Sequence, residues 1–481
     1  MAICSVNPVT LKEMRQSVRG MFINILLVIT LVVNGLFICR TLIFNEKVGM
    51  DFTIARQLFG QIYFMLIAGS FILIPAYLGN RFASEISDKE NSLFFSTGLK
   101  PSSIVWGKFF SGAILVTMFY SSIVPFMILL YFLRGLDVVK MLLTVFYSFI
   151  FSLLSIMFML AFNSDASHPG IKRSKNVIGV IFLLFMSTSL SNLYMFIGYS
   201  GDSVTSLFYW ARMLTYLVLE LLAGGFLFII TVYRISPKQS NRAFAVKIYT
   251  AIFWFLTMLM AVAWSFSDIF AGPMYEFHPL KLWLISMTII SIAAMVMSAA
   301  EPNTASKRVR REISANPVKR VFQYLFFSGC ANTFTFSTIM AVLTIITAAV
   351  FEAAKISSLN AMLTITLTAA LLYGLMYGLT TITIKRHFFK DRSDTKIPIM
   401  ITVILVFIGT VTPVLIAFYL YDNISAAGDL GWYAVGNPFI LFGVKWPIFK
   451  VLSFTSVFTV VLAAFNWRWF YESFRQFRQT K

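Results

Sequence analysis

The chain has 481 residues, of which 58% are hydrophobic and 12% are charged, whereas soluble domains average about 25% charged residues. No soluble fold could bury so many Phe, Leu and Ile side chains, so the composition excludes a soluble globular protein and predicts an all-α, polytopic membrane protein. The net charge of +19 fits either a nucleic-acid partner or basic cytoplasmic loops, and the positions of the charges decide between them.

The N-terminal stretch, residues 1–19, predicts an amphipathic helix at the cytoplasmic membrane surface. It contains an Asn-Pro pair, which is typical of a helix start. Leu11, Met14 and Val18 fall on one stripe, and most charged residues face elsewhere. Such a helix should lie along the membrane with its basic side towards the lipid head groups. A basic flank that only orients the first span is the alternative.

Apolar runs follow along the whole chain. Crossing the hydrocarbon core takes about 17–25 apolar residues, and on this measure the sequence predicts twelve membrane spans. They cover residues 20–41, 57–79, 107–133, 140–163, 176–198, 207–233, 248–268, 281–300, 334–352, 360–383, 397–421 and 450–467.

The basic residues alternate from one side of these spans to the other. With the N-terminus inside, 29 of the 39 Lys and Arg residues lie on the inner side, and every inner segment holds at least three. The inner segments are 1–20, 80–108, 163–176, 234–247, 301–322, 384–397 and 467–481. This is the positive-inside pattern, so both termini should be cytoplasmic, and the charge argues against nucleic acid as a partner. The expected location is the plasma membrane, such as a bacterial inner membrane.

The segment that leaves the second span, "EISDKENSLFFSTGLKPSSIVWGK", predicts a short helix outside the membrane. Asp88 and Glu90 would lie in its first turn, where they complement the helix dipole. Leu93 and Phe95 offer apolar contact surface, and Gly98 can end the helix. The pattern favours a helix that enters a groove on another protein. A loop helix that rests on the spans of this chain is the alternative.

The order of these features is similar to that of a known family. An amphipathic N-terminal helix, two spans and a loop that runs through "TGLKPSSIVWGK" into the third span resemble the permease subunits of ABC exporters of the ABC-2 type. The resemblance covers about residues 1–235, with six spans. It implies that residues 85–100 form the coupling helix, which docks on a separate ATPase through Asp88, Glu90, Leu93, Phe95 and Gly98. The usual Gly-Thr of this family is replaced here by Asn91-Ser92.

The resemblance also implies the partners. The chain lacks the phosphate-binding pattern GxxxxGK[ST], so ATP and Mg would be bound by the partner ATPase and this chain would be a transport subunit, not an enzyme. Two permeases, identical or different, would form the complete transporter. Residues 236–481 add six spans of unassigned role. Within them, residues 316–329 repeat the Asn-Pro-Val start and the final Gly of the N-terminal helix and predict a second amphipathic segment.

Two further features lie within the spans. Gly374 and Gly378 form a GxxxG on the tenth span, which allows close helix approach, although two incidental glycines are an equal alternative. Glu220 lies in the middle of the sixth span, where an acid is costly and therefore a candidate functional group. The alternative function is accordingly a twelve-span secondary transporter that uses an ion gradient through Glu220.

Overall fold

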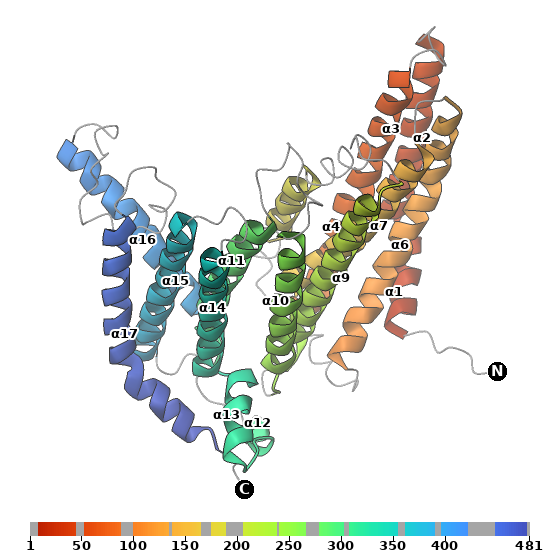
Figure 1. The fold of residues 1–481 in the computed structure, drawn as a ribbon. Helices are drawn as coiled ribbons and strands as arrows, with labels where there is room; N and C mark the ends of the chain where they lie inside the picture. The colour runs from red at the N-terminus through yellow and green to blue at the C-terminus, as the bar shows by residue number, and fades with distance from the viewer. Residues whose placement is uncertain are drawn as a thin grey trace. The chain divides into compact units, whose positions relative to one another are not determined.

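A computed structural model describes most of the chain, and every regular element in the described part is helical. The described residues are 8–44, 52–87, 100–133, 137–164, 175–188, 205–237, 240–265, 279–302, 307–354, 361–389, 396–421 and 448–478. The contacts divide the chain into two compact units, Met1–Ser236 and Pro237–Lys481, and each is described by itself (Figure 1).

The first unit begins with a short helix and continues with long apolar helices. In chain order its elements are α1 (Pro8–Arg19), α2 (Met21–Phe44), α3 (Phe52–Ile67), the π-helical turn η1 (Ala68–Leu73), α4 (Ile74–Ser87), α6 (Pro101–Leu129), the 3-10 turn η2 (Leu130–Leu133), α7 (Val138–Asn163), a helix over Lys175–Thr188 and α9 (Leu207–Ile235). Local chemistry sets several starts. Pro101 opens α6, and Asp137 caps α7 by accepting the Val139 amide at 3.0 Å.

The second unit has the same kind of elements. They are α10 (Ala243–Ser265), α11 (Pro279–Ser298), α12 (Lys307–Arg311), α13 (Pro317–Phe326), α14 (Cys330–Ala353), α15 (Ala361–Phe388), α16 (Lys396–Tyr421) and α17 (Ile448–Gln476). Asn316 caps α13 by accepting the Val318 amide at 3.0 Å, as the Asn-Pro pair predicts. Gly329 has a φ of 152°, which glycine adopts without strain, so the chain can turn between α13 and α14.

Ten of the described helices are long and apolar enough to cross a membrane. They are Met21–Phe44, Ile54–Ile86, Pro101–Leu129, Val138–Asn163, Leu207–Ile235, Ala243–Ser265, Pro279–Ser298, Cys330–Ala353, Met362–Phe388 and Val451–Gln476. Many of their large apolar side chains are exposed, for example Ile29 and Val461. Lipid tails solvate such side chains, whereas water does not. The chain is therefore a multi-pass membrane protein.

The core of the first unit packs around the π-helical turn in its second spanning helix. Gly69 lies in this turn, and the buried ring of Phe119 on α6 packs directly against it. The next residue, Ser70, accepts a hydrogen bond from the Ser152 hydroxyl on α7 at 3.0 Å. Tyr120 donates to Ser148 at 3.1 Å beside this pair. The buried hydroxyl groups thus satisfy one another where η1, α6 and α7 meet.

In the second unit, the two glycines of the predicted GxxxG face neighbouring helices. A Cβ atom on Gly374 would lie 3.0 Å from Ile292 on α11, and one on Gly378 would lie 2.9 Å from Phe334 on α14. Both glycines therefore permit α15 to approach its neighbours closely.

We expect Gly69→Ala to lower the free energy of unfolding by about 1–3 kcal/mol through overpacking. The new Cβ would lie 2.0 Å from Cζ of Phe119. Gly35→Ala on α2 is the matched control, because nothing lies within 4 Å of its Cβ position. The stability of both variants is measured by thermal unfolding in detergent. In a double variant, Phe119→Leu should reduce the loss of stability caused by Gly69→Ala. Equal midpoints for the two alanine variants would contradict this packing argument.

Candidate functional site

The predicted docking residues Asp88, Glu90, Leu93, Phe95 and Gly98 lie outside the described residues. The helices on either side of them are described. The preceding helix, α4, ends at Ser87, and α6 begins at Pro101. The geometry at these two helix ends therefore shows what the segment is connected to.

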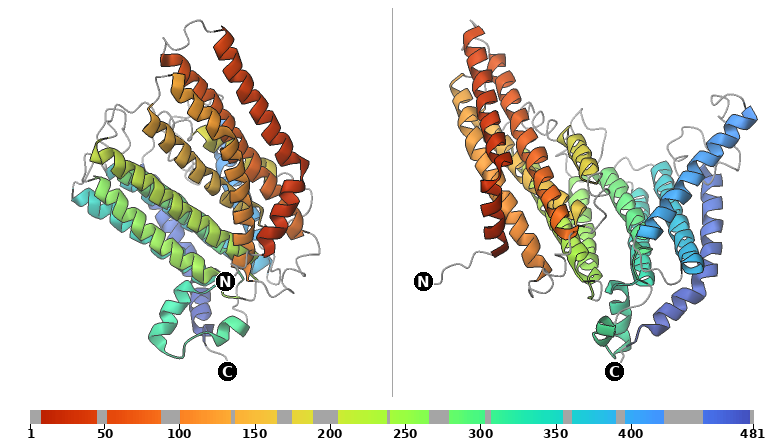
Figure 2. Two further views of the ribbon diagram at one scale, coloured as in Figure 1. Left: turned by 90° about the vertical axis from the view of Figure 1, so that its right-hand side faces the viewer. Right: turned by 180° about the vertical axis from the view of Figure 1, so that it is seen from behind.

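The helix α1 lies beside the start of α6, at the N-terminal end of α2 (Figure 2). The face that it turns to the protein carries Thr10, Glu13 and Ser17, which are all buried and recur at helical spacing. Leu11, which the sequence places on an apolar stripe, is 42% exposed, and Met14 is half-buried. The side chain of the third stripe residue, Val18, is outside the described part. Three of the four buried side chains described on α1 are thus polar, and the fourth is Val9.

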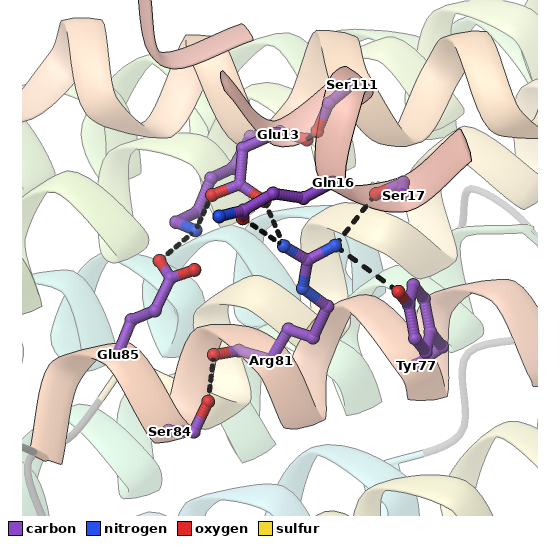
Figure 3. Close-up of polar contacts among 9 residues, drawn as sticks. Glu13, Gln16, Ser17, Tyr77, Arg81, Ser84, Glu85 and Ser111 are labelled. Carbon is purple, nitrogen blue, oxygen red and sulfur yellow. Dashed lines mark hydrogen bonds and ion pairs between the residues drawn. The ribbon is translucent and has the colours of Figure 1, made fainter. Parts of the chain in front are cut away.

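An ion cluster forms where this polar face meets α4 and α6. We define it by Glu13, Arg81, Glu85 and Lys108 (Figure 3). The ammonium of Lys108, which is 5% exposed, donates to Glu13 Oε1 at 2.8 Å and to Glu85 Oε2 at 2.5 Å. Lys108 on α6 therefore links α1 to the last turn of α4.

Arg81 makes the second connection between α4 and α1. Its guanidinium donates to Gln16 Oε1 at 2.6 Å and to the Ser17 hydroxyl at 2.9 Å, and it lies 3.4 Å from Glu13 Oε2. It also donates to the Tyr77 hydroxyl at 3.3 Å, which keeps the guanidinium over one turn of its own helix (Figure 3). A planar guanidinium suits such a task because its donors point in several fixed directions.

The ion cluster is electrically balanced, with two carboxylates and two cations. Burial would raise the pKa of the Glu13 carboxyl, but the charge and hydrogen bond of Lys108, together with Arg81, outweigh burial and hold that pKa below its ordinary value of 4.5. Glu13 is therefore ionised at neutral pH. A buried, fully paired cluster is costly to break, because removing one member leaves the others desolvated and unpaired.

This arrangement provides a mechanical connection between helices. Within the described residues, no group of three His, Cys, Asp or Glu side chains could hold a metal ion. The members of the ion cluster come from α1 and from the two helices that flank residues 88–99. The ion cluster thus ties α1 to the end of the second spanning helix and to the start of the third.

Glu220, the other candidate functional residue, lies on α9 and is 6% exposed. Neither of its carboxylate oxygens has a hydrogen-bond partner among the described residues. Such a group is rare in a spanning helix, because a buried carboxylate without a partner is costly.

The second unit also anchors a short helix through buried charges. Glu301 accepts the Gly329 amide at 2.6 Å and the Thr333 hydroxyl at 3.0 Å. Lys247 donates to two carbonyls at the end of α13, at 3.0 and 2.7 Å, and Lys385 donates to two carbonyls after α11, at 2.7 and 2.9 Å. Here the buried cations contact backbone oxygens instead of carboxylates.

Sequence reasoning did not select Glu13, Arg81 or Glu85 as site residues. A signal was present, because Arg81 and Glu85 are four residues apart at the end of a span and so share one helix face. Charges at span ends are common, however, and are usually solvated.

Comparison of this chain with family models, with curated proteins and with solved structures found no match.

We expect Glu13→Gln to lower the free energy of unfolding by about 3 kcal/mol at neutral pH, since Lys108 and Arg81 then lose a buried partner. Because the folded-state pKa of Glu13 lies below 4.5, its contribution is present above pH 4.5 and is lost as the pH falls below that value. The difference in thermal midpoint between wild type and variant should therefore shrink in acid.

The matched control is Glu472→Gln. Glu472 pairs with Arg468 on one helix at 3.0 Å, but the two side chains are 49% and 91% exposed. An exposed pair contributes about 0–1 kcal/mol, so this variant should unfold at nearly the wild-type midpoint. A Glu13→Gln variant as stable as Glu472→Gln would refute the role of the ion cluster.

Proposed function

We propose that this chain is the permease subunit of an ATP-driven ABC exporter of the ABC-2 type. The observation that carries the proposal is the ion cluster. It joins α1 to α4 and α6, the two helices that flank residues 88–99. That segment resembles a coupling helix in sequence, and a coupling helix needs a stiff connection to the spans that it moves.

The proposed mechanism starts at the partner ATPase, which would bind ATP and Mg. Closure of two ATPases would displace residues 85–100 of each permease. The buried contacts of Lys108 and Arg81 would pass this displacement to α1 and to the second and third spanning helices. The spans would then alternate between inward-facing and outward-facing states, and a homodimer or heterodimer of permeases would form the path.

The full topology is part of this proposal. Ten described helices meet the length and hydropathy of a span. Two shorter apolar helices, Lys175–Thr188 and Ile397–Thr412, overlap the predicted fifth and eleventh spans. Counting these two gives twelve spans with both termini in the cytoplasm of a plasma membrane. The basic inner segments support this orientation.

The ATPase docking site is tested with Leu93→Asp. We expect the wild-type chain to co-purify in mild detergent with a co-expressed ATP-binding subunit encoded beside it. The variant should lose that subunit, because a carboxylate would replace the apolar anchor of a helix in its groove. Bound subunit and ATP hydrolysis are the measurements.

The control for this experiment is Val318→Asp on α13. Val318 is 64% exposed, so the same chemical change occurs on another short helix without removing a buried contact. This variant should retain the ATP-binding subunit. Equal retention by both variants would argue against docking at residues 85–100, and transport by the chain alone without ATP would refute the proposed function.

A second candidate function is a secondary transporter driven by an ion gradient. The observation in its favour is Glu220, whose buried carboxylate oxygens have no hydrogen-bond partner among the described residues. We expect Glu220→Gln to abolish gradient-driven uptake into proteoliposomes if the acid carries a proton, while an ABC permease should keep its ATP-dependent transport. Ser122→Ala, which removes a hydroxyl from another spanning helix, is the control. Uptake unaffected by Glu220→Gln would eliminate this second candidate.

A further inference from the structure

The C-terminal end of α2, opposite to α1, lies beside the start of α3 (Figure 1). Two adjoining hollows are lined by residues of these two helices. One has a volume of about 200 Å³ and the other a volume of about 500 Å³. Gln57 and Gln61 line both, so the two hollows form one continuous groove. We call it the α2–α3 groove.

The groove has a polar part and an apolar part. The smaller hollow has a mainly polar surface, formed by Arg40, Thr41 and the two glutamines, and it is also bordered by Phe44, Ile54 and Leu58. The larger hollow is lined by Phe37, Gly60, Phe64 and Met65 beside the same glutamines, and its surface is mainly apolar. A ligand that fills both parts must carry a polar head and an apolar chain.

The two parts are also ordered along the helices. Arg40 lies four residues before the end of α2 at Phe44, or about 6 Å along the axis at 1.5 Å per residue. Phe64 lies twelve residues after the start of α3 at Phe52, or about 18 Å from that end of the helix. The polar part is therefore near the helix ends and the apolar part is deeper. Head groups and acyl chains of a bilayer have the same order.

The charge of the polar part selects the head group. The guanidinium of Arg40 is exposed and makes no hydrogen bond or ion pair with any other described residue. A guanidinium binds a phosphate through paired, charge-assisted hydrogen bonds, and the glutamine amides supply further donors. A second copy of this chain packed symmetrically here would bring its own Arg40 and Arg56 towards the same polar end, which like-charge repulsion disfavours.

We infer that the α2–α3 groove binds an anionic phospholipid of the surrounding bilayer, with its phosphate at Arg40 and an acyl chain along Gly60 and Phe64. The inference does not depend on the proposed function, since binding is a property of the chain alone.

The experiment measures phosphatidylglycerol binding to the detergent-purified full chain by native mass spectrometry. Arg40→Gln removes the phosphate ligand, and Gly60→Leu fills the apolar part. The space around Gly60 is open, because nothing lies within 4 Å of its Cβ position, so leucine should not disturb the fold. Each variant should weaken phosphatidylglycerol binding by about tenfold. Arg40→Gln loses a charge-assisted hydrogen bond to the phosphate, and Gly60→Leu loses the apolar contacts of the acyl chain.

Two matched controls separate the groove from general effects. Arg56 is an exposed cation near the start of α3 and lines neither hollow, so Arg56→Gln removes a nearby charge without changing the groove. Gly35→Leu adds the same side chain as Gly60→Leu, at an open position on α2 that is outside the groove. Both should bind phosphatidylglycerol as wild type does. Monoolein, which has a chain but no phosphate, should bind equally to wild type and Arg40→Gln.

The inference is overturned if Arg40→Gln and Arg56→Gln weaken binding equally, because general interfacial charge would then explain it. It is also overturned if Gly60→Leu leaves phosphatidylglycerol binding unchanged and instead converts a dimer to monomers, because the groove would then be a contact between copies.

Discussion

The ion pairs of Lys108 with Glu13 and Glu85 are the interaction on which the base of the first unit depends. The ammonium of Lys108 is 5% exposed, and two carboxylates replace the water that it has lost. One carboxylate comes from α1 and the other from the last turn of α4, so Lys108 requires both helices in place at once. The end of the second spanning helix and the start of the third are thereby held together.

In both units, buried charged side chains hold a helix outside the spans, but their hydrogen-bond partners differ. In the first unit, carboxylates neutralise the cations that hold α1. In the second unit, Lys247 and Lys385 donate to backbone carbonyls, and the carboxylate of Glu301 accepts from the Gly329 amide. Carbonyl oxygens at helix ends lack partners within the helix, so lysine side chains satisfy them. A helix outside the spans is thus tied to a spanning helix in both cases.

The α2 helix connects two distinct chemical environments. Its N-terminal end follows α1 and the ion cluster, and its C-terminal end carries Arg40 beside the polar part of the α2–α3 groove. From Ile25 to Leu36 its exposed side chains are apolar, as hydrocarbon requires. A displacement at the ion cluster therefore acts on a helix whose opposite end contacts the lipid head groups in our proposal.

The sequence alone determined the class of this protein and the start of several helices. Long apolar runs must cross a membrane because no soluble core could hold them, and Asn316 caps α13 because side-chain capping is a local interaction. Periodicity also predicts that α1 is amphipathic, but it singles out the apolar stripe that contains Leu11 and not the face that carries Glu13. Only the tertiary structure decided that Glu13 faces inward, because its partner Lys108 is 95 residues away and a pairing over that distance leaves no periodic signal.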